Sequence, residues 1–342
     1  MSLTETFLKL TPAGILDAVE VGGRRATGRV VALNSMENRV YDVELEDGAR
    51  VVAKFYRPGR WSAETILDEH RFLDDLAAEG VPVAAPLRLG SGPAPAGAGG
   101  PPSAEGSDNA SPAPTLGQME GILFALFPRV RGRPVEEPSE AELRRLGALL
   151  AQLHNVGARR DAPHRLRINP HTYGRQDLEF LEANQLVPAN VWPRYREAAA
   201  RILDAVEPRF EGAPAQRIHG DCHRGNLLWD GHDFLFVDFD DMLVGPPVQD
   251  VWLLTPGRDA EGQAHRQALL EGYEALREFD RDTLSLVEPL RAMRLIHYSA
   301  WIARRWEDQA FRRVFPHFGT VRYWQQETQD LLEQLSVILG LE

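Results

Sequence analysis

The sequence predicts an α+β protein with two lobes: a small N-terminal antiparallel five-stranded sheet with one main helix, and a larger, mostly helical C-terminal lobe. Three observations predict this class. Strand-like segments joined by short turns fill most of the first 130 residues, one helical pattern interrupts them, and helical patterns succeed one another after Pro134. We therefore expect the lobes to comprise residues 1–130 and 131–342.

Turn and capping residues define the elements of the N-terminal lobe. Thr11-Pro12 and Gly22-Gly23 bracket a short helix, because Pro suits a first turn and Gly suits the residue past a helix end. Glu46-Asp47-Gly48 forms a hairpin turn, and Gly80 ends an amphipathic helix. The main helix is expected over residues 61–79, and the strands over residues 26–33, 39–45, 49–56, 86–89 and 121–127.

Residues 91–117 are dominated by Gly, Pro, Ala and Ser. Such a composition offers too little apolar surface to offset the chain entropy lost on ordering, so it predicts a flexible insertion in a surface connection. Beyond Pro134, helices are expected over residues 139–156, 176–186, 192–206, 261–278, 284–308 and 320–339.

Charge and composition exclude several classes of protein. The net charge of −12 argues against broad nucleic-acid binding, which requires a basic surface. No apolar run approaches the roughly 18 residues of a membrane span, and the first residues lack the pattern of a signal peptide. The single cysteine, Cys222, fits a reducing cytosol. We therefore expect a cytoplasmic protein with no nucleic-acid or membrane partner.

The segment at residues 217–241, RIHGDCHRGNLLWDGHDFLFVDFDD, carries the most specific chemistry. Phosphoryl transfer from ATP needs a carboxylate to accept the hydroxyl proton, and oxygen ligands that hold Mg²⁺ on the phosphates. Asp221, Asn226 five residues later, and Asp238 at the end of the next strand have the spacing of a kinase catalytic loop. The segment predicts Asp221 as the general base and Asn226 and Asp238 as Mg²⁺ ligands. Leu228 is expected beneath the adenine of ATP.

Lys54 is the expected phosphate-binding ammonium. Of the 38 basic residues only Lys9 and Lys54 are lysines, and Arg cannot replace a compact ammonium at a tight site. Lys54 shares one face of its strand with Val52, which is expected to cover the adenine. Glu69 falls within the apolar stripe of the following helix, where a lone carboxylate needs a partner. A Lys54–Glu69 ion pair is therefore expected, the alternative being that Glu69 lies at the solvated edge of the stripe.

Other polar residues carry weaker signals. Ser35 and Asn38 occupy the turn between the first two strands, where they either contact phosphate or serve only the turn. Asp250 is expected to accept N–H bonds from the catalytic loop. Asp240 and Asp241 are either solvated or add charge near the metals. His219 supports the loop or acts in catalysis, and Cys222 is a packing residue or an oxidation sensor.

Two sets of motifs resemble known families. HGDCHRGN with VDFDDMLVGPPVQD resembles the aminoglycoside phosphotransferase and choline kinase superfamily, which has a two-lobed protein-kinase-like fold. ALNSMENRVYDVE, VVAKFYRPGRW, ILDEHRFL, VPVAAP and FALFPRVRGRPV resemble the bacterial stress response kinase A family. This resemblance extends over residues 33–254, and the insertion departs from it.

The resemblance implies a cytoplasmic, ATP- and Mg²⁺-dependent kinase that phosphorylates Ser or Thr of a protein substrate. It implies Asp221 as proton acceptor, Asn226 and Asp238 as magnesium ligands, and Ser35 at the ATP site. Only 11 residues separate Asp238 from Asp250, which leaves no room for a long activation loop. The alternatives are a small-molecule kinase acting on an amino alcohol, sugar or aminoglycoside, and a nucleotide-binding regulator without catalysis. The expected state is a monomer.

Overall fold

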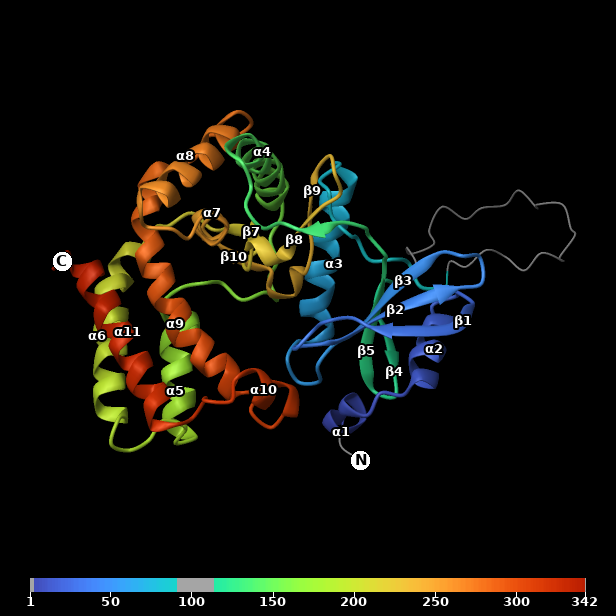
Figure 1. The fold of residues 1–342 in the computed structure, drawn as a ribbon, viewed down its shortest axis with the longest axis horizontal. Coiled ribbons are helices and arrows are strands. Elements are labelled where there is room, and N and C mark those ends of the chain that lie inside the picture. The colour runs from blue at the N-terminus through green and yellow to red at the C-terminus, as the bar shows by residue number, and fades with distance from the viewer. Residues whose placement is uncertain (1–2, 91–113, 342) are drawn as a thin grey trace, which may run out of the picture. The chain divides into compact units, whose positions relative to one another are not determined.

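The computed structural model describes residues 3–90 and 114–341 and divides into two compact units (Figure 1). One unit comprises Met1–Arg133 and Trp229–Asp240, and the other comprises Pro134–Leu228 and Asp241–Glu342. Most of the insertion expected at residues 91–117 lies outside the described residues.

The N-terminal unit contains an antiparallel five-stranded sheet in the order β1-β2-β3-β5-β4. The five-stranded sheet predicted from the sequence is thus confirmed. Ile15 of α2 packs with Ala53 and Phe55 of β3 in the core on one face of the sheet. Because side chains alternate along a strand, Val52 and Lys54 lie on the opposite face. The elements are α1 (Leu3–Leu8), α2 (Pro12–Val21), β1 (Ala26–Ala32), β2 (Arg39–Leu45), β3 (Arg50–Phe55), α3 (Ala63–Ala78), β4 (Gly117–Met119) and β5 (Ile122–Pro128).

One predicted strand is wrong. Residues 86–89 form no strand, and the edge position of the sheet is taken by β4, at the end of the expected insertion. Pro86 has no backbone N–H to donate to a neighbouring strand. β4 pairs instead with β5 across a tight turn in which Glu120 and Gly121 have φ of 50° and 83°. This left-handed backbone matches the twist of a two-residue hairpin.

Residues 229–240 belong to the N-terminal unit although the residues on both sides of them, 134–228 and 241–342, belong to the other unit. In β9 (Phe234–Phe236), the N–H of Phe236 donates to the Pro82 carbonyl at 2.9 Å. The ring of Phe239 meets Phe72 of α3 edge-on, with centroids 5.9 Å apart. These contacts place Asp238 and Asp240 in the same unit as Lys54.

The C-terminal unit is mostly helical, and the closest helix pair in it depends on glycine. A Cβ on Gly147 of α4 would lie 1.9 Å from the Leu269 carbonyl oxygen, and one on Gly272 of α8 would lie 1.8 Å from that of Arg144. Only glycine allows these backbones to approach so closely. The helices are α4 (Glu140–Gly157), α5 (Gln176–Ala183), α6 (Trp192–Phe210), α7 (Val248–Leu254), α8 (Ala260–Glu274), α9 (Val287–Ala303), α10 (Gln309–Val314) and α11 (Val321–Leu339).

Short elements connect these helices, and one expected helix is divided. The helix predicted at residues 284–308 consists of a 3-10 helix (Arg281–Leu286), then α9, then a break before α10. Pro289 fits the first turn of α9, and the Asp308 carboxylate caps α10 by accepting from the Ala310 N–H at 2.9 Å. A π-helix (His171–Arg175) precedes α5 and was not expected. The remaining elements are β6 (Arg133–Pro134), β7 (Gln216–Ile218), β8 (Leu227–Trp229), β10 (Leu243–Gly245) and the 3-10 turns Arg224–Asn226 and Phe239–Asp241.

Across residues 3–90 and 114–341, no helix has both the length and the apolar character that crossing a bilayer requires.

Candidate functional site

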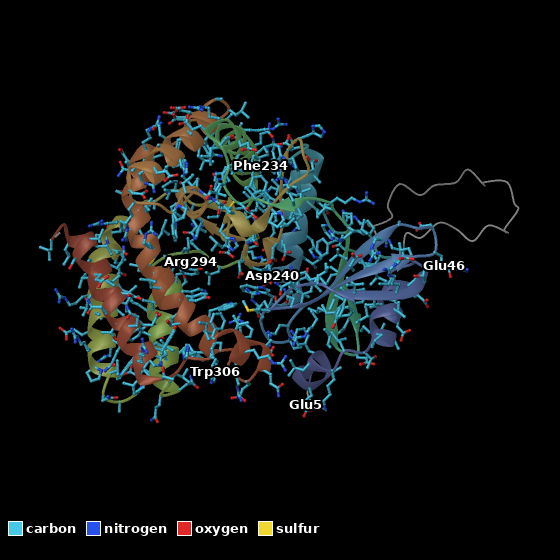
Figure 2. All side chains as sticks on the ribbon, viewed as in Figure 1. Glu5, Glu46, Phe234, Asp240, Arg294 and Trp306 are labelled. Carbon is cyan, nitrogen blue, oxygen red and sulfur yellow. The ribbon has the colours of Figure 1, made fainter. Side chains whose placement is uncertain are left out.

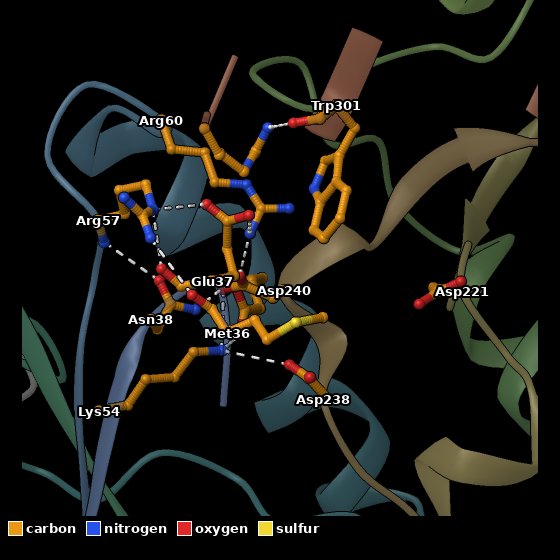
Figure 3. Close-up of polar contacts among 12 residues, drawn as sticks. Met36, Glu37, Asn38, Lys54, Arg57, Arg60, Asp221, Asp238, Asp240 and Trp301 are labelled. Atoms are coloured by element: carbon orange, nitrogen blue, oxygen red, sulfur yellow. Dashed lines mark hydrogen bonds and ion pairs between the residues drawn. The ribbon is translucent and has the colours of Figure 1, made fainter. Parts of the chain in front are cut away.

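Lys54 is the centre of a buried charge cluster in the N-terminal unit (Figure 3). Its Nζ lies 2.9 Å from Asp240 Oδ1, 3.6 Å from Asp238 Oδ1 and 3.8 Å from Glu69 Oε1. Glu69 is buried on α3 and not at a solvated edge. Burial by itself would lower the pKa of the Lys54 ammonium, but attraction to Asp240 and then to Glu69 outweighs it and raises that pKa well above its usual value. Lys54 is therefore a fixed positive charge.

Asp240 is the closest carboxylate to Lys54, and the sequence left its role open. It is buried, and it receives a hydrogen bond from Asn38 Nδ2 at 2.8 Å and an ion pair from Arg60 at 2.5 Å. Burial opposes ionisation, but Lys54 and Arg60 outweigh burial and hold the pKa of Asp240 well below its usual range. Asp240 is therefore a buried anion and not a solvated surface residue.

The turn that carries Ser35 and Asn38 is fastened by hydrogen bonds within the N-terminal unit. Asn38 is buried; its Nδ2 donates to Asp240 and its Oδ1 accepts from the Arg57 N–H at 3.1 Å. Protein groups thus occupy both ends of this amide, and a contact between the Asn38 backbone N–H and phosphate stays a prediction. Figure 3 shows Asn38 enclosed between Arg57 and Asp240. Ser35 is partly exposed in the same turn, and its contact with ATP stays a prediction.

Asp238 has an unusual backbone. Its φ of 62° lies in the left-handed region, which a non-glycine residue adopts at a cost of about 1 kcal/mol or more. Its carboxylate is 60% exposed and remains within 3.6 Å of Lys54. This conformation presents an exposed carboxylate beside the buried cluster.

In the C-terminal unit, Asp250 anchors the loop that begins at His219. Its carboxylate accepts the N–H groups of His219 at 2.9 Å and Gly220 at 2.8 Å, as the sequence predicted. His154 Nε2 contacts the same carboxylate at 3.1 Å. Gly220 has φ of 83°, and a Cβ there would lie 2.4 Å from the Asp241 carbonyl oxygen. The loop therefore needs both the buried carboxylate and the glycine.

Asp221 follows directly on this anchor, and three side chains surround it. Asn226 Nδ2 donates to the Asp221 carbonyl at 2.9 Å and lies 3.5 Å from Oδ2. His223 Nε2 is 3.4 Å from Oδ2, and Arg294 Nη2 of α9 is 2.9 Å from Oδ1. Burial opposes ionisation, but the His223 hydrogen bond and the Arg294 charge outweigh it and hold the pKa of Asp221 well below its usual range. Asp221 is therefore ionised at neutral pH.

Other residues of this loop are placed as follows. Cys222 is fully buried, and burial raises the pKa of its thiol well above the usual value, so it has the character of a packing residue. His219 is also fully buried, which favours its supporting role. Leu228 of β8 and Val52 of β3 are each partly exposed, and their contacts with adenine stay predictions. Arg294 and Arg60 were not identified from the sequence, because nothing in their local patterns separates them from the many other arginines.

Asp250→Ala is expected to lower the free energy of unfolding by about 3–5 kcal/mol, because it leaves two loop N–H groups and His154 buried without their acceptor. The measurement is urea unfolding followed by circular dichroism. Asp282→Ala is the matched control, because Asp282 is exposed on a 3-10 helix of the same unit and should change stability little. Equal midpoints for the two variants would contradict the anchoring role.

Comparison with known proteins relates this chain to phosphotransferases and kinases. A model of the phosphotransferase enzyme family matches residues 29–287. The chain is 38% identical to stress response kinase A of Escherichia coli strain K12 over 335 residues, covering 97% of this chain and 95% of the relative. The same identity and coverage relate it to a relative named serine/threonine protein kinase RdoA, of Salmonella typhimurium strain LT2.

A solved structure extends the likeness to the fold. An amicoumacin kinase, hAmiN, in complex with AMP-PNP, Ca²⁺ and Ami is 17% identical and superposes with a TM-score of 0.72, covering 96% of each chain. The fold class and the family resemblance predicted from the motifs are confirmed by these matches.

Proposed function

Because this chain belongs to the phosphotransferase enzyme family, we propose that it is an ATP- and Mg²⁺-dependent kinase that phosphorylates Ser or Thr hydroxyls of a protein. The observation that carries the proposal is the Asp250-anchored loop, in which Asp221 and Asn226 are hydrogen-bonded to each other. A relative with 38% identity is named a serine/threonine protein kinase, which supports a protein acceptor. The proposal includes a monomeric enzyme in the cytoplasm.

In this mechanism Asp221 is the general base. The acceptor hydroxyl binds the ionised carboxylate, its oxygen attacks the γ-phosphorus, and its proton passes to Asp221. The bond from the γ-phosphorus to the bridging oxygen breaks, and ADP leaves with the electron pair. Asn226 and Asp250 hold the loop so that the carboxylate keeps its orientation during this transfer.

The oxygen donors of Asn226 and Asp238 suit a magnesium ion. Asn226 directs Nδ2 to Asp221, so its Oδ1 is the atom that would contact a cation. Asp238 offers an exposed carboxylate, and Mg²⁺ commonly takes one or two protein oxygens together with phosphate oxygens and waters. Bound there, the ion would neutralise charge on the phosphates.

Lys54 is proposed to bind the α- and β-phosphates. Asp240 and Glu69 fix its ammonium, and this removes the entropy cost of ordering a flexible side chain when nucleotide binds. Val52 and Leu228 would contact the adenine and Ser35 the phosphates, whereas Asn38 acts indirectly by holding Asp240.

Asp238→Ala is expected to weaken Mg²⁺-dependent nucleotide binding about tenfold or more, a loss typical of disturbing a metal site. Calorimetric titration with AMP-PNP measures it, with and without Mg²⁺. Asp17→Ala, an exposed carboxylate of α2 in the same unit, is the control. If Asp238→Ala bound Mg²⁺-nucleotide with wild-type affinity, Asp238 would not be a ligand.

The acceptor class is tested by incubating the purified chain with γ-labelled ATP and Mg²⁺, together with a protein extract or with small alcohols. Label on Ser or Thr of protein is the expected result. Turnover only with added amino alcohols, sugars or aminoglycosides would replace the proposal with a small-molecule kinase. Nucleotide binding without any transfer would indicate a regulator.

A further inference from the structure

Arg294 lies beside Asp221, and the proposed mechanism gives this arginine no role. It projects from α9 (Figure 2), and its Nη2 lies 2.9 Å from Asp221 Oδ1. Its side chain is 30% exposed, so the guanidinium is neither sealed in the core nor fully solvated. A guanidinium has five N–H donors in a planar fork, and one contact to a carboxylate oxygen uses only part of them.

Arg294 lies beside the carboxylate that an acceptor hydroxyl would contact. An acceptor hydroxyl that gives its proton to Asp221 must come within about 2.6–3.2 Å of a carboxylate oxygen. Arg294 and His223 approach different oxygens of that carboxylate, Oδ1 and Oδ2 respectively. An acceptor hydroxyl bound to Oδ2 would therefore be separated from the Arg294 guanidinium only by the Asp221 carboxylate. The residue next to that hydroxyl in the substrate would then be within reach of the other N–H groups of Arg294.

The same face of α9 continues as a rigid surface. Tyr298 and Trp301 follow Arg294 at helical spacings of four and seven residues, which places all three on one side of the helix. The rings of Tyr298 and Trp301 stack with centroids 5.5 Å apart and an interplanar angle of 10°, and Tyr298 is 42% exposed. Arg305 lies over the Trp301 ring at 4.9 Å. This face therefore joins positive charge to aromatic surface.

We propose that Arg294 determines acceptor specificity: its guanidinium bridges Asp221 and a carboxylate on the acceptor, so that favoured substrates carry Asp or Glu beside the target Ser or Thr. The inference rests on the proposed protein kinase activity and adds the class of sequence that is phosphorylated. Arg is suited to the task, because its planar fork can contact two carboxylates at once, whereas a lysine ammonium is a point charge.

The test uses the full chain with ATP, Mg²⁺ and three Ser peptides that differ only in flanking residues, which are Asp, Ala or Lys. For the wild type, kcat/KM should be about tenfold or more higher for the Asp peptide than for the Ala peptide. Arg294→Gln should raise KM for the Asp peptide about 10- to 100-fold, the size of a lost charge-assisted hydrogen bond, and change KM for the Ala peptide little. Arg294→Lys should restore part of the preference. Arg313→Gln, on exposed α10, should behave as wild type.

Two results would overturn the inference. One is a wild-type enzyme that labels the three peptides with equal kcat/KM. The other is an Arg294→Gln enzyme whose kcat falls equally on all three with KM unchanged, since Arg294 would then only hold the base. A phosphoserine-flanked peptide separates a general preference for anions from one for carboxylates. Label on small alcohols but on no peptide removes the proposed function and this inference together, whereas labelling of peptides without an acidic preference removes only the inference.

Discussion

Asp221→Asn is expected to lower kcat for phosphoryl transfer about 10²- to 10⁴-fold, the usual contribution of a general base. Asparagine keeps the shape of the side chain, but its amide cannot take up the proton of an acceptor hydroxyl. Nucleotide affinity should change little, because Asp221 contacts Arg294, His223 and Asn226 and its proposed task begins only when an acceptor is bound. Initial rates with γ-labelled ATP and calorimetric titration with AMP-PNP measure the two properties.

Asp230→Asn is the matched control for this substitution. Asp230 lies in an exposed turn, where it accepts the N–H groups of His232 and Asp233 at 2.8 Å each. An asparagine oxygen can accept the same bonds, so activity should remain at the wild-type level. If Asp221→Asn retained wild-type kcat while folding normally, another group would have to accept the proton.

Lys54→Met should abolish most nucleotide affinity and lower the free energy of unfolding by about 3–5 kcal/mol. Without the ammonium, Glu69 is left buried without this cation, and Asp240 loses its 2.9 Å partner. Removing one member of a buried charge cluster is costly, because the remaining charges stay out of water uncompensated. Urea unfolding and nucleotide titration measure the two effects.

The chain provides its own control, since its other lysine, Lys9, is exposed. Lys9→Met should leave stability and nucleotide binding close to wild type. Lys54→Arg tests the shape of the site: the broad guanidinium fork should fit poorly among three carboxylates and recover only part of the affinity. Comparable stability of Lys54→Met and Lys9→Met would contradict the proposed role of the cluster.

The ion pair between Lys54 and Glu69 is a tertiary contact that periodicity in the sequence predicts. Helical periodicity places Glu69 on the apolar face of α3, and strand alternation places Lys54 on the same face of its strand as Val52, so the sequence alone predicts that the two charges pair. The same periodicity gave no reason to rank Asp240 above Asp241, because neither lies in a regular element with a repeating face. The structure shows Asp240 as the nearest partner of Lys54.

The strand predicted at residues 86–89 was wrong because local composition does not determine strand pairing. Residues 86–89 have a strand-like composition, but whether a segment joins a sheet depends on which neighbour can supply hydrogen bonds. β4 is only three residues long, too short for a periodic signal, and it is defined by its pairing with β5. Such pairing exists only in the folded chain.

The amino-acid sequence by itself determined the two-lobed α+β class, most of the helices and the pairing of Lys54 with Glu69, and its spacing predicts Asp221, Asn226 and Asp238 as site residues. Those features rest on spacing within one segment or on a repeating apolar face, both of which are local. Tertiary structure alone decided that Arg294 meets Asp221, that Arg60 and Asn38 hold Asp240, and that β4 completes the sheet. Each of these depends on groups brought together from distant parts of the chain, where an arginine or an amide has no local mark that distinguishes it from its many equivalents.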